Sequence, residues 1–242
     1  MFPYLSIIIP CYNEKNTIIE LINKINLVSR IKKQIILVDD CSTDGSSELI
    51  KNKLSNRIDK IIYHKKNLGK GACIKSAQQF IEGNIVIIQD SDLEYDPNDY
   101  HVLIKPILNN EFKVVYGSRL LKKNTKENLQ NFSHWIRVVG NYLLTKFSNF
   151  VNKQKLTDAH TCYKAFEGKL FKKILLKENN FNFCPEITTK VGNLNYKITE
   201  VPISYFGRNY AEGKKISAID GLKALKTILK YKFFDKKNLN DE

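Results

Sequence analysis

Short apolar runs alternate with longer amphipathic stretches along the first half of the chain. The apolar runs predict strands at residues 5–9, 34–38, 61–64, 85–89 and 114–116. Between them, apolar positions recur at helical spacing over residues 17–28, 46–54 and 71–81, and Pro97 and Asn98 would open a further helix. Strands that are apolar throughout and alternate with helices predict a mostly parallel sheet covered by helices on both faces.

The pattern changes after Gly117. Residues 118–133 are polar and basic and predict a loop, and a long helical stretch follows at 134–150. Shorter strands are predicted at 163–166, 196–200 and 203–206, and a last helix at 217–233. Because no repeat, low-complexity segment or linker composition divides the chain, we predict a single α/β domain over residues 1–242.

The composition is that of an ordinary globular chain. Its 242 residues, 43% of them hydrophobic and 26% charged, are enough to bury a sizeable core. No apolar run approaches the roughly 20 residues that span a bilayer, and the N-terminus lacks the features of a signal peptide, so we expect a cytoplasmic protein. Five scattered cysteines without a C-x-x-C pair predict neither a disulfide framework nor a zinc site. The four histidines share no spacing, so we expect no metal or catalytic role for them.

The chain is strongly basic. It carries 39 lysines and arginines against 25 acidic residues, a formal charge of +14. Such an excess indicates an anionic partner, which could be a nucleic acid, an acidic lipid or a phosphorylated substrate. The alternative is that the lysines are solvent-exposed and have no specific partner, and composition alone fits both interpretations.

Polar and acidic side chains follow each of the five strands predicted in the first half. They occupy residues 10–14, 39–45, 67–71, 90–94 and 117–119. Ligands of open α/β sheets bind beyond the carboxyl ends of the strands. The sequence therefore predicts a binding site at this edge of the sheet.

The sharpest of these groups is Asp90-x-Asp92. Two carboxylates one residue apart can both face one hard cation, with Glu94 as a third oxygen ligand, and Mg²⁺ or Mn²⁺ prefers such ligands. A cation held there would neutralise the charge that builds on a leaving diphosphate. Aspartate is common in turns, so the position after a buried strand is what makes the pair informative.

Two further groups are open to more than one interpretation. Asp39 and Asp40 would suit the N–H donors of a nucleotide base, whereas Asp44 would cap the helix that follows. Lys70, between Gly69 and Gly71, resembles a phosphate-cradling turn before a helix. The full P-loop pattern is absent.

Together these motifs resemble glycosyltransferase family 2, and within it most closely the dolichyl-phosphate mannose synthase branch with its bacterial polyprenyl-phosphate relatives. The matching segments are residues 7–14, 38–45, 67–71, 89–94, 116–119, 156–158, 161–164, 185–187, 201–208 and 212–215. The resemblance implies a GT-A fold with a Rossmann-like, nucleotide-sugar-binding half over about 1–117 and an acceptor-binding half over 118–242. It also implies inverting transfer of mannose or glucose, from GDP-mannose or UDP-glucose, to a dolichyl or undecaprenyl phosphate.

The resemblance further implies roles for individual residues. The nucleotide sugar would be bound by Pro10, Tyr12, Glu14, Asp39, Asp40, Lys70, Asp90 and Ser91. The metal would be held by Asp90, Asp92 and Glu94, although relatives carry an amide at the position of Glu94. The acceptor phosphate would meet Arg119, Arg137, Arg208, Lys214 and Lys215. The catalytic set would be Asp92, Arg119, Asp158 and Arg208, with Asp158 the general base for a hydroxyl acceptor but only a positioning group for a phosphate, which is already ionised.

Two other functions were compared with transfer to a polyprenyl phosphate. The same fold would serve a transferase that glycosylates a hydroxyl of a glycolipid, lipopolysaccharide or polysaccharide precursor. A nucleic-acid-binding protein is not expected, because none of the usual motifs is present and the acidic strand ends would repel phosphates.

The last predicted helix raises the question of a membrane. It places Ile219, Leu222, Leu225 and Leu229 on one stripe and Lys223, Lys226 and Lys230 on another. Such a helix either lies in a membrane interface or packs on the sheet. Residues 208–237 hold 9 basic and 3 acidic residues, an excess that anionic lipid would attract. We therefore expect a peripheral protein at the cytoplasmic face of a membrane, held there directly or by a separate membrane protein.

Overall fold

A central sheet organises the molecule. The computed structural model describes residues 3–121, 132–207, 218–235, 237 and 239, and side chains within them except at 132–138 and 218–220. The strands are β1 (Tyr4–Cys11), β2 (Lys32–Asp39), β3 (Lys60–Tyr63), β4 (Ile85–Ile88), β5 (Val114–Ser118), β6 (Lys164–Glu167) and β7 (Ile198–Pro202). In these described parts the sheet has seven strands in the order β3-β2-β1-β4-β6-β5-β7. Only β6 runs antiparallel to its neighbours, so the predicted mostly parallel sheet is confirmed.

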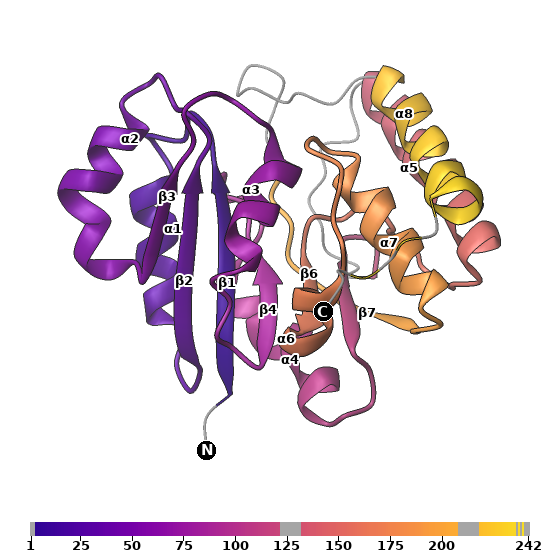
Figure 1. The fold of residues 1–242 in the computed structure, drawn as a ribbon, viewed down its shortest axis with the longest axis horizontal. Helices are drawn as coiled ribbons and strands as arrows, with labels where there is room; N and C mark the ends of the chain where they lie inside the picture. The colour runs from indigo at the N-terminus through magenta and orange to yellow at the C-terminus, as the bar shows by residue number, and fades with distance from the viewer. Residues whose placement is uncertain (1–2, 122–131, 208–217, 236, 238, 240–242) are drawn as a thin grey trace.

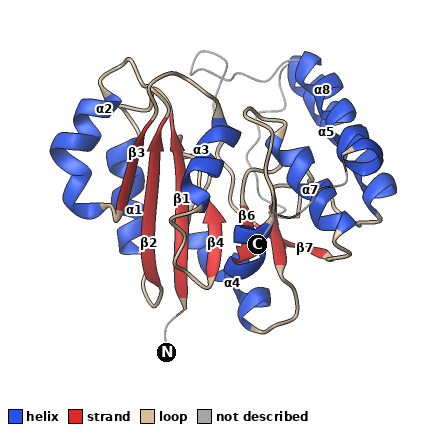
Figure 2. Ribbon diagram, viewed as in Figure 1, coloured by secondary structure: helices blue, strands red, loops and turns tan. Residues whose placement is uncertain are grey.

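The strands are buried because both of their faces are apolar. In β1, Ile7 and Ile9 belong to one hydrophobic cluster and Ile8 belongs to the other, and all three are fully buried. Successive side chains of a strand point to opposite faces, so an unbroken apolar run requires a cover on each side. Figure 2 shows this arrangement, with helices on both sides of the sheet.

Helices provide that cover, and the described residues form eight α-helices. They are α1 (Ile18–Leu27), α2 (Ser46–Leu49), α3 (Lys70–Gln78), α4 (Tyr100–Leu108), α5 (Phe132–Asn152), α6 (Gly168–Lys173), α7 (Phe183–Asn193) and α8 (Ala218–Leu229). Helices α1 and α4 pack on one face of the sheet, whereas α3, α6 and α7 pack on the other. Helix α2 continues as a π-helical turn at Ile50–Leu54, and α8 continues likewise as η5 (Lys230–Phe234).

The strand predicted at 203–206 is wrong. The chain leaves the sheet after β7, and only Tyr205 forms an isolated bridge, with Tyr95. The backbone N–H of Ser204 donates to Asp99 Oδ2 (2.6 Å) and that of Phe206 donates to the carbonyl of Glu94 (2.9 Å). These partners come from the segment after β4, so the backbone is satisfied without a strand neighbour.

The sequence left open whether the last helix lies in a membrane interface or packs on the sheet. Helix α8 packs on α7 and α5, which lie beside it in Figure 1. Its buried side chains include Ala224 and Ile228, whereas Leu222 and Leu229 of the predicted apolar stripe are exposed. The side chain of Ile219 lies outside the described ones. None of the described helices combines the length and hydrophobicity needed to cross a bilayer.

Candidate functional site

The loops that follow β1, β2 and β4 are tied together at one edge of the sheet. Asn13 accepts the backbone N–H of Thr43 on Oδ1 (2.8 Å), and its own N–H donates to Ser42 Oγ (3.0 Å). The hydroxyl of Ser91 donates to the carbonyl of Pro10 (2.9 Å). Pro10 and Ser91, predicted from separate motifs, are therefore in direct contact, and the predicted binding edge is one connected surface.

Asp39 holds the turn after β2. Its Oδ1 accepts the hydroxyl of Ser42 and its Oδ2 accepts the hydroxyl of Ser47, each at 2.6 Å. Asp44 accepts the backbone N–H of Ser46 (2.9 Å), as expected for a residue near the start of α2. The Asp39 carboxylate thus fixes the shape of the loop that borders the edge.

Asp40 holds the segment that leads into α3. The backbone N–H groups of Leu68 and Gly69 donate to its carboxylate at 2.9 and 2.7 Å, and His64 Nδ1 lies 2.6 Å from Oδ1. The other ring nitrogen of His64 contacts the hydroxyl of Ser76 at 2.9 Å. With three protein partners, Asp40 positions this loop, and His64, given no role from sequence, is part of the same framework.

A trio around Asp40 has the composition of a metal site. Its ligand atoms on Asp40, His64 and Cys73 all lie within 4.8 Å of one another. However, the carboxylate and both ring nitrogens already have hydrogen-bond partners, and burial raises the pKa of the Cys73 thiol. We therefore interpret the trio as hydrogen-bonded packing rather than a metal centre.

Lys70 reaches across the edge to the Asp-x-Asp motif. Its Nζ forms an ion pair with Asp90 Oδ1, and both side chains are largely buried. Burial alone would lower the pKa of Lys70, but the adjacent Asp90 carboxylate more than offsets it and raises that pKa well above its usual value. Lys70 is therefore a charged ammonium group at the carboxyl end of β4.

The glycines beside Lys70 make room for a neighbouring segment of the protein. A Cβ on Gly69, where φ is +95°, would lie 2.2 Å from Asn180 Oδ1, and one on Gly71 would lie 2.4 Å from the carbonyl of Glu178. The N–H of Ala72 donates to the carbonyl of Asn179 (3.0 Å). Packing against residues 178–180 thus explains both glycines, and the phosphate-cradling role of the turn stays a prediction.

The segment against these glycines is itself held from α7. Glu186 is fully buried and accepts the backbone N–H groups of Lys177 (2.7 Å) and Glu178 (2.9 Å). It also forms a buried ion pair with Lys190 (2.8 Å). Glu186 thus supports the turn at Lys70 from behind.

The three predicted metal ligands do not form one cluster in this structure. Their carboxylate oxygens do not all lie within 4.8 Å of one another, although all three residues are described. Asp92 Oδ1 accepts the N–H of Glu94 (3.1 Å), whereas Glu94 Oε2 accepts the hydroxyl of Tyr205 (2.9 Å). Leu93 between them has φ +64°, which bulky residues rarely adopt and which is often retained at functional turns. Asp90 and Asp92 still provide the oxygen donors that a hard cation takes.

Arg119 and Asp158 form the second half of the site. The guanidinium donates from Nε to Oδ2 (2.7 Å) and from Nη2 to Oδ1 (2.8 Å). Burial alone would raise the pKa of Asp158, which is completely buried, but the charge of Arg119 more than offsets it and lowers that pKa. Asp158 is therefore an ionised partner of Arg119.

Two residues missed from sequence hold this ion pair. Glu200 in β7 accepts the N–H groups of Thr157 (2.6 Å) and Asp158 (2.9 Å), and Asn141 in α5 donates to Asp158 Oδ1 (3.2 Å). Both lie far from residues 157–158 in the chain. No local pattern marked them.

Tyr205 joins the two halves of the site. Its hydroxyl donates to Glu94, and its ring lies 5.1 Å from Arg119 Cζ. A cation over an aromatic face is attracted to it. The metal-ligand motif and the Arg119–Asp158 pair are therefore mechanically linked.

Two more basic side chains, Lys164 and His160, lie near this pair, and Lys164 is fully buried. Burial lowers the pKa of Lys164 to about 8, although its Nζ donates to the carbonyl of Ala159 (3.0 Å) and sits 3.5 Å from the ring centre of Tyr116. Burial also lowers the pKa of His160 to about 4, so that ring is neutral at pH 7, and its Nε2 has no partner among the described residues. Neither was assigned a role from sequence.

The remaining predicted residues are less well placed. Tyr12 and Glu14 lie in the loop after β1, where Glu14 Oε2 accepts the hydroxyl of Thr17 (2.8 Å). Arg137 belongs to α5, but its side chain is outside the described ones. Arg208, Lys214 and Lys215 lie outside the described residues. Their contacts with the acceptor phosphate therefore stay predictions.

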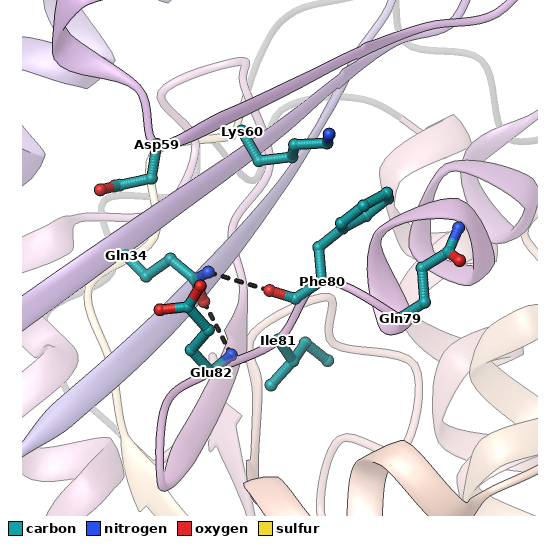
Figure 3. Close-up of a pocket in the computed structure, with 7 residues that line it drawn as sticks. All are labelled: Gln34, Asp59, Lys60, Gln79, Phe80, Ile81 and Glu82. Carbon is teal, nitrogen blue, oxygen red and sulfur yellow. Dashed lines mark hydrogen bonds between the residues drawn. The ribbon is translucent and has the colours of Figure 1, made fainter.

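A hollow of about 420 Å³ lies at the opposite edge of the sheet, away from these groups. It is lined by Gln34, Asp59, Lys60, Gln79, Phe80, Ile81 and Glu82 (Figure 3). Gln34 donates to the carbonyl of Phe80 (2.9 Å) and accepts the N–H of Glu82 (2.9 Å). The side chain of Gln34 is thus used in structural hydrogen bonds. The hollow contains none of the predicted site residues.

Comparison with known proteins finds relatives of this chain among glycosyltransferases. A dolichyl-phosphate β-glucosyltransferase of Trichomonas vaginalis is 26% identical over 247 aligned residues, covering 96% of this chain and 73% of that protein. A UDP-N-acetylglucosamine–dolichyl-phosphate N-acetylglucosaminyltransferase of Methanococcus voltae is 29% identical over 247 aligned residues. The alignment covers 93% of this chain and 95% of that protein.

The fold has close structural counterparts. A crystal structure of glucosyl-3-phosphoglycerate synthase from Mycobacterium tuberculosis, in complex with Mn²⁺, UDP and phosphoglyceric acid, has a TM-score of 0.67. It is 16% identical and covers 94% of this chain and 78% of its own, so it confirms the GT-A type of fold. The model of the family described as glycosyl transferase family 2 matches residues 6–175. The chain therefore belongs to glycosyl transferase family 2 and is a glycosyltransferase.

Proposed function

We propose that this protein transfers a hexose from a nucleotide sugar to a polyprenyl phosphate, with inversion, at the cytoplasmic face of a membrane. The observation that carries the proposal is the bidentate pair that Arg119 forms with the fully buried Asp158. The two relatives described above are both named for transfer to dolichyl phosphate, which supports the same acceptor class.

The state of Asp158 distinguishes the two acceptor classes. A hydroxyl acceptor needs a base to remove its proton. Asp158 is a poor base, because its carboxylate is buried, bonded through both oxygens to Arg119, and has a lowered pKa. A phosphate acceptor arrives already ionised and needs only a cation to orient it. Arg119, held rigid by Asp158, provides a guanidinium suited to that purpose.

The donor would lie at the carboxyl ends of β1, β2 and β4. Pro10, Ser91 and Lys70 border this edge, and Asp90 and Asp92 would hold Mg²⁺ or Mn²⁺ against the diphosphate. Such an ion, when bound, neutralises charge on the leaving nucleotide. Lys70 contributes a second positive charge beside Asp90, and Tyr205 would keep the donor and acceptor halves in register.

The experiment is a transfer assay with a panel of donors. Radiolabelled UDP-glucose, UDP-N-acetylglucosamine and GDP-mannose are each offered with a polyprenyl phosphate and Mg²⁺ or Mn²⁺. The proposal predicts an acid-labile labelled lipid from one donor, lost in Asp92→Asn but kept in Glu111→Gln, an exposed acid elsewhere. Absence of a lipid product from every donor, with the chain folded and nucleotide bound, would refute the proposed acceptor.

A further inference from the structure

Helix α5 presents an apolar stripe to solvent. Val139, Tyr142, Leu143 and Phe150 recur at helical spacing and are all exposed, Leu143 to 59% and Phe150 to 85%. The opposite side of the helix carries the buried residues Thr145, Ser148 and Asn152. The apolar side of α5 is therefore the side that the protein leaves uncovered.

Helix α8 and its extension η5 repeat this arrangement. Leu222 is 64% exposed, Phe233 57% and Phe234 85%, and Leu229 is exposed as well. The buried side chains of the same segment are Ala224, Thr227, Ile228 and Tyr231. Small or polar side chains are thus among those that face inward, whereas several large apolar side chains face solvent.

Both stripes face the same side of the molecule. Helix α7 packs against α5, α8 and η5, and Asn152 donates to Thr189 of α7 (3.2 Å) while Asn193 of α7 donates to the carbonyl of Tyr231 (2.9 Å). Helices α5 and α8 lie side by side (Figure 1), and a Cβ on Gly221 would lie 3.7 Å from Leu144. Because both helices turn their inner sides to α7, their exposed stripes form one surface. We name it the outer helix face, made of Val139, Tyr142, Leu143, Phe150, Leu222, Leu229, Phe233 and Phe234.

The segments that make this surface carry only positive charges, although Lys230 is paired with Glu178 (2.9 Å) beside them. Residues 139–152 and 221–234 contain no aspartate or glutamate, and their lysines are Lys146, Lys223, Lys226, Lys230 and Lys232. An exposed apolar patch of this extent marks an interaction site. A second copy of the chain would bring like charges together, whereas anionic lipid headgroups complement the lysines and acyl chains take up the apolar side chains.

The inner side of α5 connects this surface to the candidate site. Asn141 donates to Asp158, the hydroxyl of Thr145 accepts the N–H of Ala159 (3.2 Å), and Asn149 donates to the carbonyl of Leu156 (2.7 Å). One helix thus separates the outer helix face from the residues proposed to orient the acceptor phosphate. A headgroup anchored in a bilayer under α5 would lie close to Arg119.

We propose that the outer helix face docks on the surface of an anionic lipid bilayer. The proposal extends the proposed function, whose acceptor lies in a membrane. It is tested without donor or acceptor, so that failure of docking and failure of transfer are separate results.

The test is sedimentation of the full chain with protein-free vesicles of phosphatidylcholine, with and without phosphatidylglycerol. Wild type is expected to bind the anionic vesicles and to be released by salt. Leu143→Ser with Leu222→Ser should lower the partition coefficient at least about tenfold, because two large apolar side chains lose their burial. Leu27→Ser is the matched control, since Leu27 is 81% exposed on α1, on the far side of the sheet. That variant should bind like wild type.

A second pair tests the charges. Lys146→Glu with Lys226→Glu should weaken binding at least about tenfold, given about 1 kcal/mol per basic residue near anionic lipid. Lys51→Glu with Lys53→Glu, exposed residues after α2, should not. Equal binding by all variants, or binding that ignores phosphatidylglycerol, would overturn the proposal. Binding to native membranes without binding to protein-free vesicles would also overturn it, because the partner of this face would then be a membrane protein.

Discussion

The Arg119 guanidinium and the Asp158 carboxylate meet edge to edge, through two hydrogen bonds of 2.7 and 2.8 Å. Asn141 in α5 also donates to the carboxylate, Glu200 in β7 accepts the backbone N–H of Asp158, and the ring of Tyr205 lies against the guanidinium. The donors on Arg119 and Asn141 occupy the carboxylate oxygens that would have to accept a proton. They make Arg119 a fixed cation and Asp158 its support.

Asp158→Asn should therefore behave as a loss of positioning. We expect KM for the polyprenyl phosphate to rise, because Arg119 loses its partner, while the acid limb of the pH dependence of kcat stays where it is. A general base would instead contribute about 10²–10⁴ to the rate, and its removal would abolish that limb. Measuring kcat and KM from pH 5 to 9 in wild type and variant separates the two roles, and a vanished acid limb would contradict ours.

The metal motif predicts a contrast between two acids. Glu94 bonds Tyr205 instead of gathering with the other two carboxylates, so Glu94→Gln, whose amide oxygen can still accept that bond, should keep activity within about threefold. Asp92→Asn should lose at least about a hundredfold, since a metal ligand stabilises charge in the transition state. Steady-state rates at several Mn²⁺ concentrations measure both. Equal losses in the two variants would show that Glu94 binds the metal after all.

Substituting alanine for glycine should have opposite effects on stability at two positions. Gly69→Ala should destabilise the protein by more than about 1 kcal/mol, because its φ is +95° and the new methyl would meet Asn180 Oδ1 at 2.2 Å. Gly140 in α5 has nothing within 4 Å of such a methyl. Gly140→Ala should therefore stabilise by about 0.5–1 kcal/mol. Urea unfolding of both variants is the measurement, and a destabilised Gly140→Ala would be inconsistent with the open surface of α5.

Lys164 gives a prediction for stability at alkaline pH. Its pKa falls from 10.5 to about 8 on folding, so between these values the unfolded chain binds more protons and stability from this group rises with pH. Below pH 8 the buried charge costs up to about 3 kcal/mol. Lys164→Met should remove that cost at pH 7. It should also reduce the change in the free energy of unfolding between pH 8 and pH 10. Paired unfolding curves test this, and a variant less stable than wild type at pH 7 would argue that the Ala159 hydrogen bond and Tyr116 contact outweigh desolvation.

The strands and the binding edge were predictable because their signals are local. Ile7, Ile8 and Ile9 are apolar on both faces, and polar residues directly follow each strand. Residues 203–206 were not predictable, since their apolar composition reads as a strand while their backbone partners, Asp99 and the carbonyl of Glu94, lie about a hundred residues earlier.

The same limit explains the packed face of α8 and the supports of the site. Spacing placed the leucines of α8 on one stripe but did not show which side of the helix packs, and the protein buries Ala224 and Ile228 on a helix that packs on α7 and α5. Glu200 and Asn141 reach Asp158 from β7 and α5, so only the three-dimensional structure associates them with it. Chemistry-bearing motifs were thus readable from sequence, whereas the residues that hold them were not.

The central claim is that the acceptor is an ionised phosphate and needs no base. The most direct measurement offers polyprenyl phosphate and the corresponding free polyprenol, at equal concentration, with the donor that supports transfer. Our account predicts label only in the acid-labile product of the phosphate, with that transfer lost in Arg119→Met. Label in the free polyprenol would contradict it, because a hydroxyl acceptor requires the proton removal that Asp158, bound to Arg119, is not placed to perform.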